Sequence, residues 1–308
     1  MIPHIIFNSE TKYSIDRKIW RSKISPPAPK NKSTSGITQP PMLAEAIVHI
    51  GKKLNKADRI KWYNQIFPKI VAYHGWIYRE RDFKKCGLAT LVHPWEYGLD
   101  NTPPWMDLFN HQTNPWFISL MSYLKIDKIV DHIRFDAKYV DIHQRTSSIE
   151  AIRLYDSLRR IRKKRYKSDL ILNKPQFAIE DLTFNSILIR GNQLLEEIAT
   201  QIGKDLPEEL KQHILRSRTA LEELWDDELR SYFSRDSISG MLLKEPSVAT
   251  LLPLYSGSIS KAKAMNLVQM IHNKKLFGLE YPLPSVPLTS KWFDPWSYWQ
   301  GPSWVNIN

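Results

Sequence analysis

The sequence predicts an all-α fold. Apolar residues recur at spacings of three and four in several segments, as on one face of a helix, and no segment shows a sustained two-residue alternation. Strand-joining Asn-Gly or Asp-Gly turns between apolar runs are missing, and the 11 glycines form no GxGxxG or GxxxxGK[ST] phosphate loop. About seven or eight helices joined by long loops are therefore expected.

The first part of the chain is expected to be extended, with the helices beginning after it. Residues 1–41 contain a Pro/Lys/Ser-rich stretch over 25–33, which favours polyproline-like backbone over helix. Directly after this leader, apolar residues spaced four, three and four apart predict a helix over 43–54. An aromatic-rich helical pattern follows from about Lys56 to Arg81.

Four further helices are predicted in the rest of the chain. One begins at the capping box Ser147-Ser-Ile-Glu150, carries apolar residues at every third position to Leu158, and ends in the basic run 159–167. Another begins at Asp181 or Leu182. A third begins at the N-cap sequence Asp205-Leu-Pro-Glu208 and buries a face that extends to Trp225. A last pattern covers about 258–272.

Charge and composition indicate which kinds of binding partner are expected. The net charge is +12, and much of the excess lies in the run 159–167. Such a run can bind nucleic acid, or it can be a solvated helix end whose cations complement the negative pole of the helix dipole. The capping box upstream favours the helix end, so no nucleic-acid partner is expected. No apolar run reaches the roughly 20 residues of a membrane-spanning helix, so no membrane partner is expected either.

The compartment is expected to be the cytoplasm. The first eight residues lack the basic region and cleavage site of a signal peptide. Cys86 is the single cysteine, which excludes an intrachain disulfide and makes a reducing compartment the default. We expect this thiol to be a small buried hydrophobic group rather than a reactive one.

The residues best suited to catalysis are concentrated in the stretch 93–105. It reads His-Pro-Trp-Glu-Tyr-Gly-Leu-Asp-Asn-Thr-Pro-Pro-Trp, with two carboxylates, one histidine and three aromatic residues between prolines. Cleavage of a glycosidic bond needs one carboxylic acid that protonates the leaving oxygen and a carboxylate that activates water or attacks carbon. Aromatic rings suit the C–H faces of a sugar. On composition alone, an ordinary packed loop is the alternative.

This stretch resembles the His-Pro-Trp-Glu-x-Gly-Leu-Asp-Asn-[Ser/Thr]-Pro signature of the glycoside hydrolase family 63 clan. The clan includes processing α-glucosidases and the bacterial mannosylglycerate and glucosylglycerate hydrolases. Further segments resemble this clan in the same order along nearly the whole chain, at 2–8, 36–41, 74–79, 181–185, 224–226, 253–257 and 298–304.

The resemblance implies a fold, a substrate class and a proton donor. The fold is an (α/α)6 toroid of paired helices around a pocket, formed incompletely by residues 1–308 as one partial catalytic domain in which 1–41 is the extended leader and substrate loop. The substrate is an α-glucoside or α-mannoside, cleaved with inversion, and Asp100 is the general acid. The residues that line the sugar subsite by this resemblance are Gln39, Trp95, Gly98, Tyr298, Trp299 and Trp304.

Two more residues of the signature loop are expected at the substrate. The amide of Asn101 can bind sugar hydroxyls. Glu96 lies four residues before Asp100 and either supplies a negative charge that raises the pKa of the acid or supports the loop by hydrogen bonding.

The histidines are expected to be structural. His93, His4 and His74 are interpreted as hydrogen-bonded polar groups rather than catalytic bases. The nine histidines show no HExxH or comparable spacing, so neither a metal nor another cofactor is predicted.

The sequence departs from the clan at the second carboxylate. The motif that carries the general base follows the 298–304 loop in the clan, and this chain ends at Asn308. Three interpretations are open: half of a split enzyme completed by a second polypeptide, which we favour; an inactive carbohydrate-binding remnant; or an active enzyme with another base such as Asp294 or Asp181. Gln300 replaces the usual arginine, which favours a neutral aglycone over an anionic one.

Overall fold

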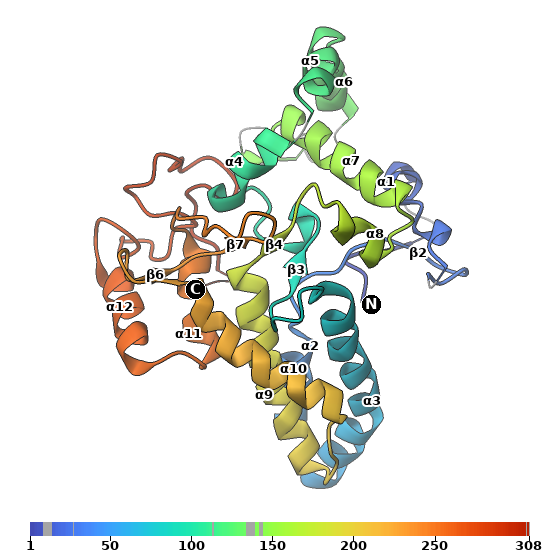
Figure 1. Cartoon of the computed structure of the whole chain (residues 1–308), viewed down its shortest axis with the longest axis vertical. Helices are drawn as coiled ribbons and strands as arrows, with labels where there is room; N and C mark the ends of the chain where they lie inside the picture. The colour runs from blue at the N-terminus through green and yellow to red at the C-terminus, as the bar shows by residue number, and fades with distance from the viewer. Residues whose placement is uncertain are drawn as a thin grey trace.

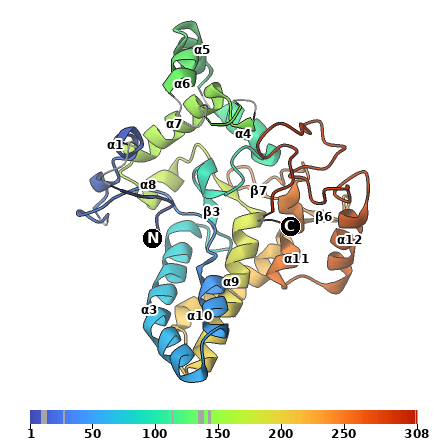
Figure 2. The same ribbon diagram turned by 180° about the vertical axis from the view of Figure 1, so that it is seen from behind.

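The computed structural model describes residues 1–8, 14–26, 28–112, 114–133, 139–141, 144–305 and 307. In this part of the chain helices dominate, and the strands are two residues long and form three small antiparallel sheets. Some of the helices pack around one central helix, and others form a projection at the top of both views (Figures 1 and 2). The expected all-α class is confirmed.

Helix α9 (Leu182–Gln201) is the centre of the fold. It packs against α2 (Leu43–Lys52), α3 (Lys56–Arg81), α10 (Glu208–Ala220) and α11 (Pro253–Ser256). Buried residues occur on every side of its first three turns, which is the pattern of a helix enclosed by others rather than of a surface helix.

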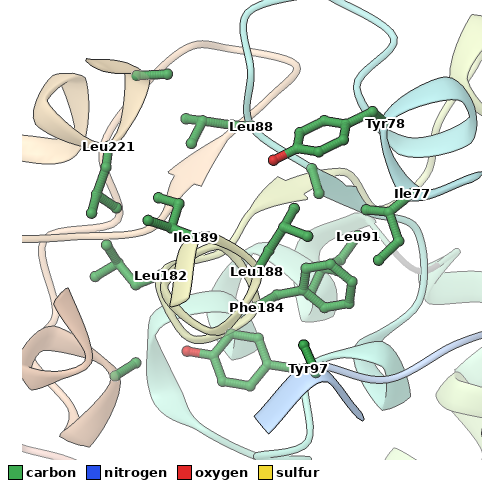
Figure 3. Packing of buried hydrophobic residues seen from close by; sticks show 14 of the residues in the cluster. Ile77, Tyr78, Leu88, Leu91, Tyr97, Leu182, Phe184, Leu188, Ile189 and Leu221 are labelled. Atoms are coloured by element: carbon green, nitrogen blue, oxygen red, sulfur yellow. The ribbon is translucent and has the colours of Figure 1, made fainter. Parts of the chain in front are cut away.

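The core formed around α9 also anchors the signature loop. Figure 3 shows Phe184 and Leu188 of α9 beside Ile77 of α3 and Leu91, with Tyr97 of the loop against the same helix. All five side chains are at most 1% exposed. Burial of each apolar side chain of this size contributes about 1.5–3 kcal/mol, so Tyr97 anchors the middle of the loop in the hydrophobic core.

A three-stranded sheet connects the start of the signature loop to the start of helix α9. Strand β4 (Ile179–Glu180) lies between β3 (Thr90–Leu91) and β7 (Arg235–Asp236), antiparallel to both. Thr90 pairs with Glu180 in this register. The signature loop follows β3 and helix α9 follows β4, so this sheet joins the two; because the strands are antiparallel, the loop and the helix leave the pair at opposite ends.

The other elements are two strand pairs, seven further helices and four short 3-10 turns in the described part of the chain. Strands β1 (Ile6–Phe7) and β2 (Ser33–Thr34) pair with each other, as do β5 (Trp225–Asp226) and β6 (Ser231–Tyr232). The remaining helices are α1 (Ser14–Trp20), α4 (Pro103–Gln112), α5 (Pro115–Tyr123), α6 (Ile126–Ile133), α7 (Ser148–Lys163), α8 (Ser168–Asn173) and α12 (Lys261–His272). Short 3-10 turns lie at Ser22–Ile24, Pro94–Glu96, Leu221–Leu224 and Val248–Leu251.

The predicted capping box is confirmed. The Glu150 backbone N–H donates to Ser147 Oγ (3.2 Å), and the Ser147 N–H donates to Glu150 Oε2 (2.7 Å). Helix α7 ends at Lys163, so the basic run is its last turn and exit, as expected. Asp156 on the same helix pairs with both Arg159 and Arg160, which neutralises part of the run.

Four predictions about the elements are wrong. The described residues hold more helices than seven or eight, because several are short. The leader contains helix α1, whose Trp20 is buried with Ile37. The N-cap of α10 is Pro207 rather than Asp205, and the helix ends at Ala220 before reaching Trp225. Finally, Tyr155, one of the apolar residues expected at every third position of α7, is exposed, whereas its neighbour Leu154 is buried.

Candidate active site

The signature loop starts at a histidine whose two ring nitrogens are both used. His93 Nδ1 accepts from the Trp95 backbone N–H (3.1 Å) and therefore caps the Pro94–Glu96 turn. That contact leaves the proton on Nε2, which donates to the Leu154 carbonyl (3.1 Å). Burial lowers the pKa of His93 to about 4. The histidine is thus neutral and structural, as predicted.

Glu96 is held in a buried ion pair. Its Oε1 accepts from Arg81 Nη2 (2.6 Å) and from the Thr38 backbone N–H (3.3 Å), and its Oε2 accepts from the Val92 N–H (2.8 Å). Three segments distant in sequence meet at this carboxylate: the end of α3, the loop before α2 and the signature loop. These contacts favour the second of the two expected roles, support of the loop, because the Arg81 guanidinium compensates the charge.

Three predicted subsite residues share one neighbourhood. Gln39 Nε2 donates to the Trp95 carbonyl (3.4 Å), and the Trp95 ring lies 5.7 Å from the ring of Trp20. Gly98 has a φ of +83°, and a Cβ there would lie 3.6 Å from Pro40. The left-handed backbone at this position favours glycine. It turns the loop back past the 36–41 segment and toward Asp100.

Asp100 lies beside a tyrosine and a cation. Tyr298 Oη donates to Asp100 Oδ2 over a long 3.4 Å, and the Arg145 guanidinium lies 5.1 Å from the centre of the Tyr298 ring. Burial raises the pKa of Asp100 to about 6, against the opposing effects of the Tyr298 hydroxyl and the Arg145 charge. The carboxyl therefore keeps its proton in mildly acidic solution, which is the state that a general acid needs.

The segment 298–304, here called the C-terminal aromatic loop, is hydrogen-bonded to Asn101, the residue after Asp100. The Trp299 backbone N–H donates to Asn101 Oδ1 (2.8 Å), and Gln300 Nε2 donates to the Asn101 carbonyl (3.1 Å). Within the aromatic loop, Trp304 Nε1 donates to the Tyr298 carbonyl (2.9 Å), and the rings of Trp299 and Trp304 stack at 4.4 Å. The structure thus brings Asp100 and Asn101 together with Tyr298, Trp299 and Trp304, three of the four predicted aromatic residues.

Sequence reasoning missed several neighbours of the acid. Thr146, Glu150 and apolar residues of α4 and α7 line a narrow gap next to Asp100. Arg145 belongs to the same segment, just before α7. No motif marks Arg145 in the sequence. Its position follows only from the packing of α7 beside the signature loop, so local patterns could not have found it.

The two substitute bases suggested by the sequence both accept hydrogen bonds from the backbone of a helix or a turn. Asp181 is the N-cap of α9: its Oδ1 accepts from the Phe184 N–H (2.7 Å) and its Oδ2 from Ser234 Oγ (3.0 Å). Burial raises the pKa of Asp181 to about 7. Asp294 is exposed, and its Oδ1 accepts from the Trp296 N–H (2.9 Å). These contacts fit helix and turn caps rather than a base that activates water.

Substitution of Asp181 by asparagine tests this assignment. Because the pKa of Asp181 is raised in the folded state, its contribution to stability is present below the unfolded pKa and is lost as pH rises through about 7. Asparagine keeps the cap without the charge. We therefore expect Asp181→Asn to lose less thermal stability than the wild type between pH 4.5 and 8, with hydrolysis unchanged.

The matched control is Asp294→Asn, which alters an exposed turn and should leave the pH dependence of melting as it is in the wild type. Loss of hydrolysis in folded Asp181→Asn would instead make Asp181 the base and refute the capping role.

Other kinds of site find little support in the described part of the chain. No three His, Cys, Asp or Glu side chains there gather closely enough to hold a metal ion. None of the helices described is both long and apolar enough to cross a membrane. Burial raises the pKa of the Cys86 thiol, which makes it less reactive.

Comparison with known proteins decides the family. A family model described as the mannosylglycerate hydrolase MGH1-like glycoside hydrolase domain matches residues 1–308. The chain belongs to this glycoside hydrolase family. A mannosylglycerate hydrolase of Thermus thermophilus is 34% identical over the whole chain, which covers 70% of that protein. A mannosylglycerate hydrolase of Selaginella moellendorffii is 31% identical, and the chain covers 60% of it.

A solved structure shows the same fold. The crystal structure of a family 63 mannosylglycerate hydrolase from Thermus thermophilus, in complex with Tris and D-glycerate, matches with a TM-score of 0.85 at 31% identity. The match covers the whole chain and 69% of that structure. The family expected from the motifs and its helical toroid are thus confirmed. The chain spans about 60 to 70% of the length of these relatives.

Proposed function

We propose that this glycoside hydrolase family member cleaves α-mannosides or α-glucosides with inversion of configuration and that Asp100 is its general acid. The observation that carries the proposal is the setting of Asp100, partly buried beside Tyr298, with its pKa raised to about 6. A carboxylic acid that keeps its proton near neutral pH can protonate the leaving oxygen of a glycoside. The stacked aromatic pair Trp299 and Trp304 supports a sugar subsite beside it.

The aglycone is proposed to be an anion such as glycerate. Gln300 alone favours a neutral aglycone, and the structure shows its amide engaged with the Asn101 carbonyl. Arg145, however, brings a guanidinium to the Tyr298 ring and close enough to Asp100 to influence its pKa. A cation at this position can pair with a carboxylate on the leaving group. The names of the relatives, mannosylglycerate hydrolases, agree with such a substrate.

The general base is proposed to come from polypeptide outside residues 1–308. Asp181 and Asp294 cap a helix and a turn, and Glu150 completes the capping box of α7. An inverting pair is separated by roughly 6.5–9.5 Å, with a water between the base and the sugar. The same observation favours one alternative function: a carbohydrate-binding remnant, or half of a split enzyme, that binds sugar without turnover.

Hydrolysis of a defined panel tests the proposal. The protein, purified together with the polypeptide that supplies the general base, is incubated with mannosylglycerate, glucosylglycerate and the methyl α-glycosides of both sugars, and released sugar is followed by proton NMR. We expect the β-anomer to appear first and the glycerate conjugates to react faster than the methyl glycosides. Appearance of the α-anomer first would refute inversion. Sugar binding by calorimetry without turnover would support the binding alternative.

The pH dependence of hydrolysis follows from the pKa of Asp100. The acid is active only when protonated, so kcat/KM should fall about tenfold per pH unit above about 6. The measurement is kcat/KM from pH 5 to 8, with circular dichroism at each pH to establish that the protein stays folded. A rate that is constant or rises up to pH 8 would exclude Asp100 as the proton donor.

A further inference from the structure

We propose that Asn101 is a positioning residue, which clamps the signature loop to the C-terminal aromatic loop and thereby holds Asp100 against Tyr298. The sequence suggests a different task for Asn101, the binding of sugar hydroxyls. The inference deepens the proposed function and rests on it for the role of Asp100 as the acid. The clamp itself is a statement about two loops and can be tested without substrate.

The clamp has two points of attachment on one residue. Asn101 Oδ1 accepts the Trp299 backbone N–H at 2.8 Å, and its carbonyl accepts Gln300 Nε2 at 3.1 Å. Asn101 is 2% exposed, and the two partners lie 198 and 199 residues away in sequence. The short hydrogen bond to the Trp299 backbone uses one of the two lone pairs of the side-chain oxygen, so the amide is held in place before any sugar binds.

The bonded residues are the direct neighbours of the catalytic pair. Asn101 follows Asp100, and Trp299 follows Tyr298, so the hydrogen bond between the second residues of each pair sets the separation of the first. Tyr298 Oη and Asp100 Oδ2 are 3.4 Å apart, a contact at the limit of a hydrogen bond that a small shift of either loop would break. Opening the clamp would also admit water to Asp100.

The aromatic loop has a second anchor, so loss of the clamp should not unfold it. Ser285 Oγ donates to the Pro302 carbonyl (2.7 Å) and accepts from the Gly301 N–H (3.2 Å). The stack of Trp299 on Trp304 also stays within the loop itself. A variant of Asn101 is therefore expected to keep the loop folded while releasing its hold on Asp100.

Variants of both attachment points separate the clamp from a general effect on folding. Asn101→Ala removes the side-chain acceptor, and Gln300→Ala removes only the second point. Asn101→Asp keeps an oxygen for the Trp299 N–H but places a second carboxylate beside Asp100. Ser303→Ala is the matched control, because it deletes a hydrogen bond of the same loop to the Tyr281 carbonyl, away from Asp100.

The readout is the titration of the Asp100 carboxyl by NMR in protein with carbon-13-labelled aspartate. Its signal is assigned by its absence in Asp100→Asn. We expect Asn101→Ala to lower the midpoint by about one pH unit, because hydration removes burial, the largest cause of the raised pKa, and this outweighs the loss of the Tyr298 hydrogen bond, which acts in the opposite direction. Gln300→Ala should give a smaller decrease and Asn101→Asp an increase, while Ser303→Ala should titrate as the wild type does.

Turnover at pH 7 gives a second, separate result. A midpoint lower by one unit leaves about a tenth of the protonated acid, so kcat of Asn101→Ala should fall about tenfold with KM nearly unchanged. Changed titration in a protein without hydrolysis would support the clamp and refute the proposed function. A folded Asn101→Ala whose Asp100 titrates as in the wild type would overturn the clamp, whatever the turnover.

Discussion

Replacement of Asp100 by asparagine is expected to reduce hydrolysis of glycerate conjugates by about 10²–10⁴-fold, the usual contribution of a positioned general acid. Asparagine has the same shape and can still accept from Tyr298 Oη, but it has no proton to give to the leaving oxygen. Sugar binding, measured by calorimetry, should therefore change far less than kcat. Equal losses in binding and turnover would indicate that the substitution disturbs the pocket rather than the chemistry.

A change of leaving group makes the same variant more informative. A dinitrophenyl glycoside departs as a stable anion and needs little protonation, so Asp100→Asn should retain most of the wild-type rate on this substrate. A base or a nucleophile at this position would be needed for both substrates. Asp107→Asn is the matched control. Asp107 lies on α4, the helix that follows Asp100; it is 53% exposed and pairs with Lys291 at 3.5 Å. It should behave as the wild type with either substrate.

The predictions that succeeded concern features encoded by neighbouring residues. The capping box at 147–150 is formed by side chains three residues apart, and the helix from Lys56 to Arg81 has the bounds that its pattern indicates. In such cases the geometry is decided within one or two turns of the chain.

The features that were missed depend on contacts far along the chain. The hydrogen bond between Asn101 Oδ1 and a backbone amide 198 residues away has no signal in the local sequence. Arg145 reaches the site only because α7 packs beside the loop, and Trp20 meets Trp95 from a distant part of the sequence. Asp205 was misassigned as a cap because its type fits, whereas its side chain is 97% exposed and faces Lys211. Residue type limits what a side chain can do, and tertiary packing selects among the possibilities.

The second large effect is expected at Glu96. Glu96→Gln keeps the shape of the side chain but leaves the Arg81 guanidinium, 4% exposed, without a compensating charge. Breaking one partner of a buried ion pair costs about 3–5 kcal/mol, because the remaining charge is desolvated and uncompensated. We expect the free energy of unfolding, measured in urea at pH 7, to fall by this amount. This loss of stability should appear without sugar, because the carboxylate joins the end of α3, the loop before α2 and the signature loop.

A neighbouring ion pair provides the control. Glu80 pairs with Arg79 at 3.1 Å, with side chains 30% and 64% exposed, so Glu80→Gln should cost less than about 1 kcal/mol. The contrast separates the two roles that the sequence leaves open for Glu96. If Glu96→Gln unfolds at the same urea concentration as Glu80→Gln but loses sugar affinity, Glu96 contacts substrate. If Glu96→Gln is strongly destabilised and the fraction still folded binds sugar normally, the carboxylate stabilises the packing of the signature loop that contains Asp100.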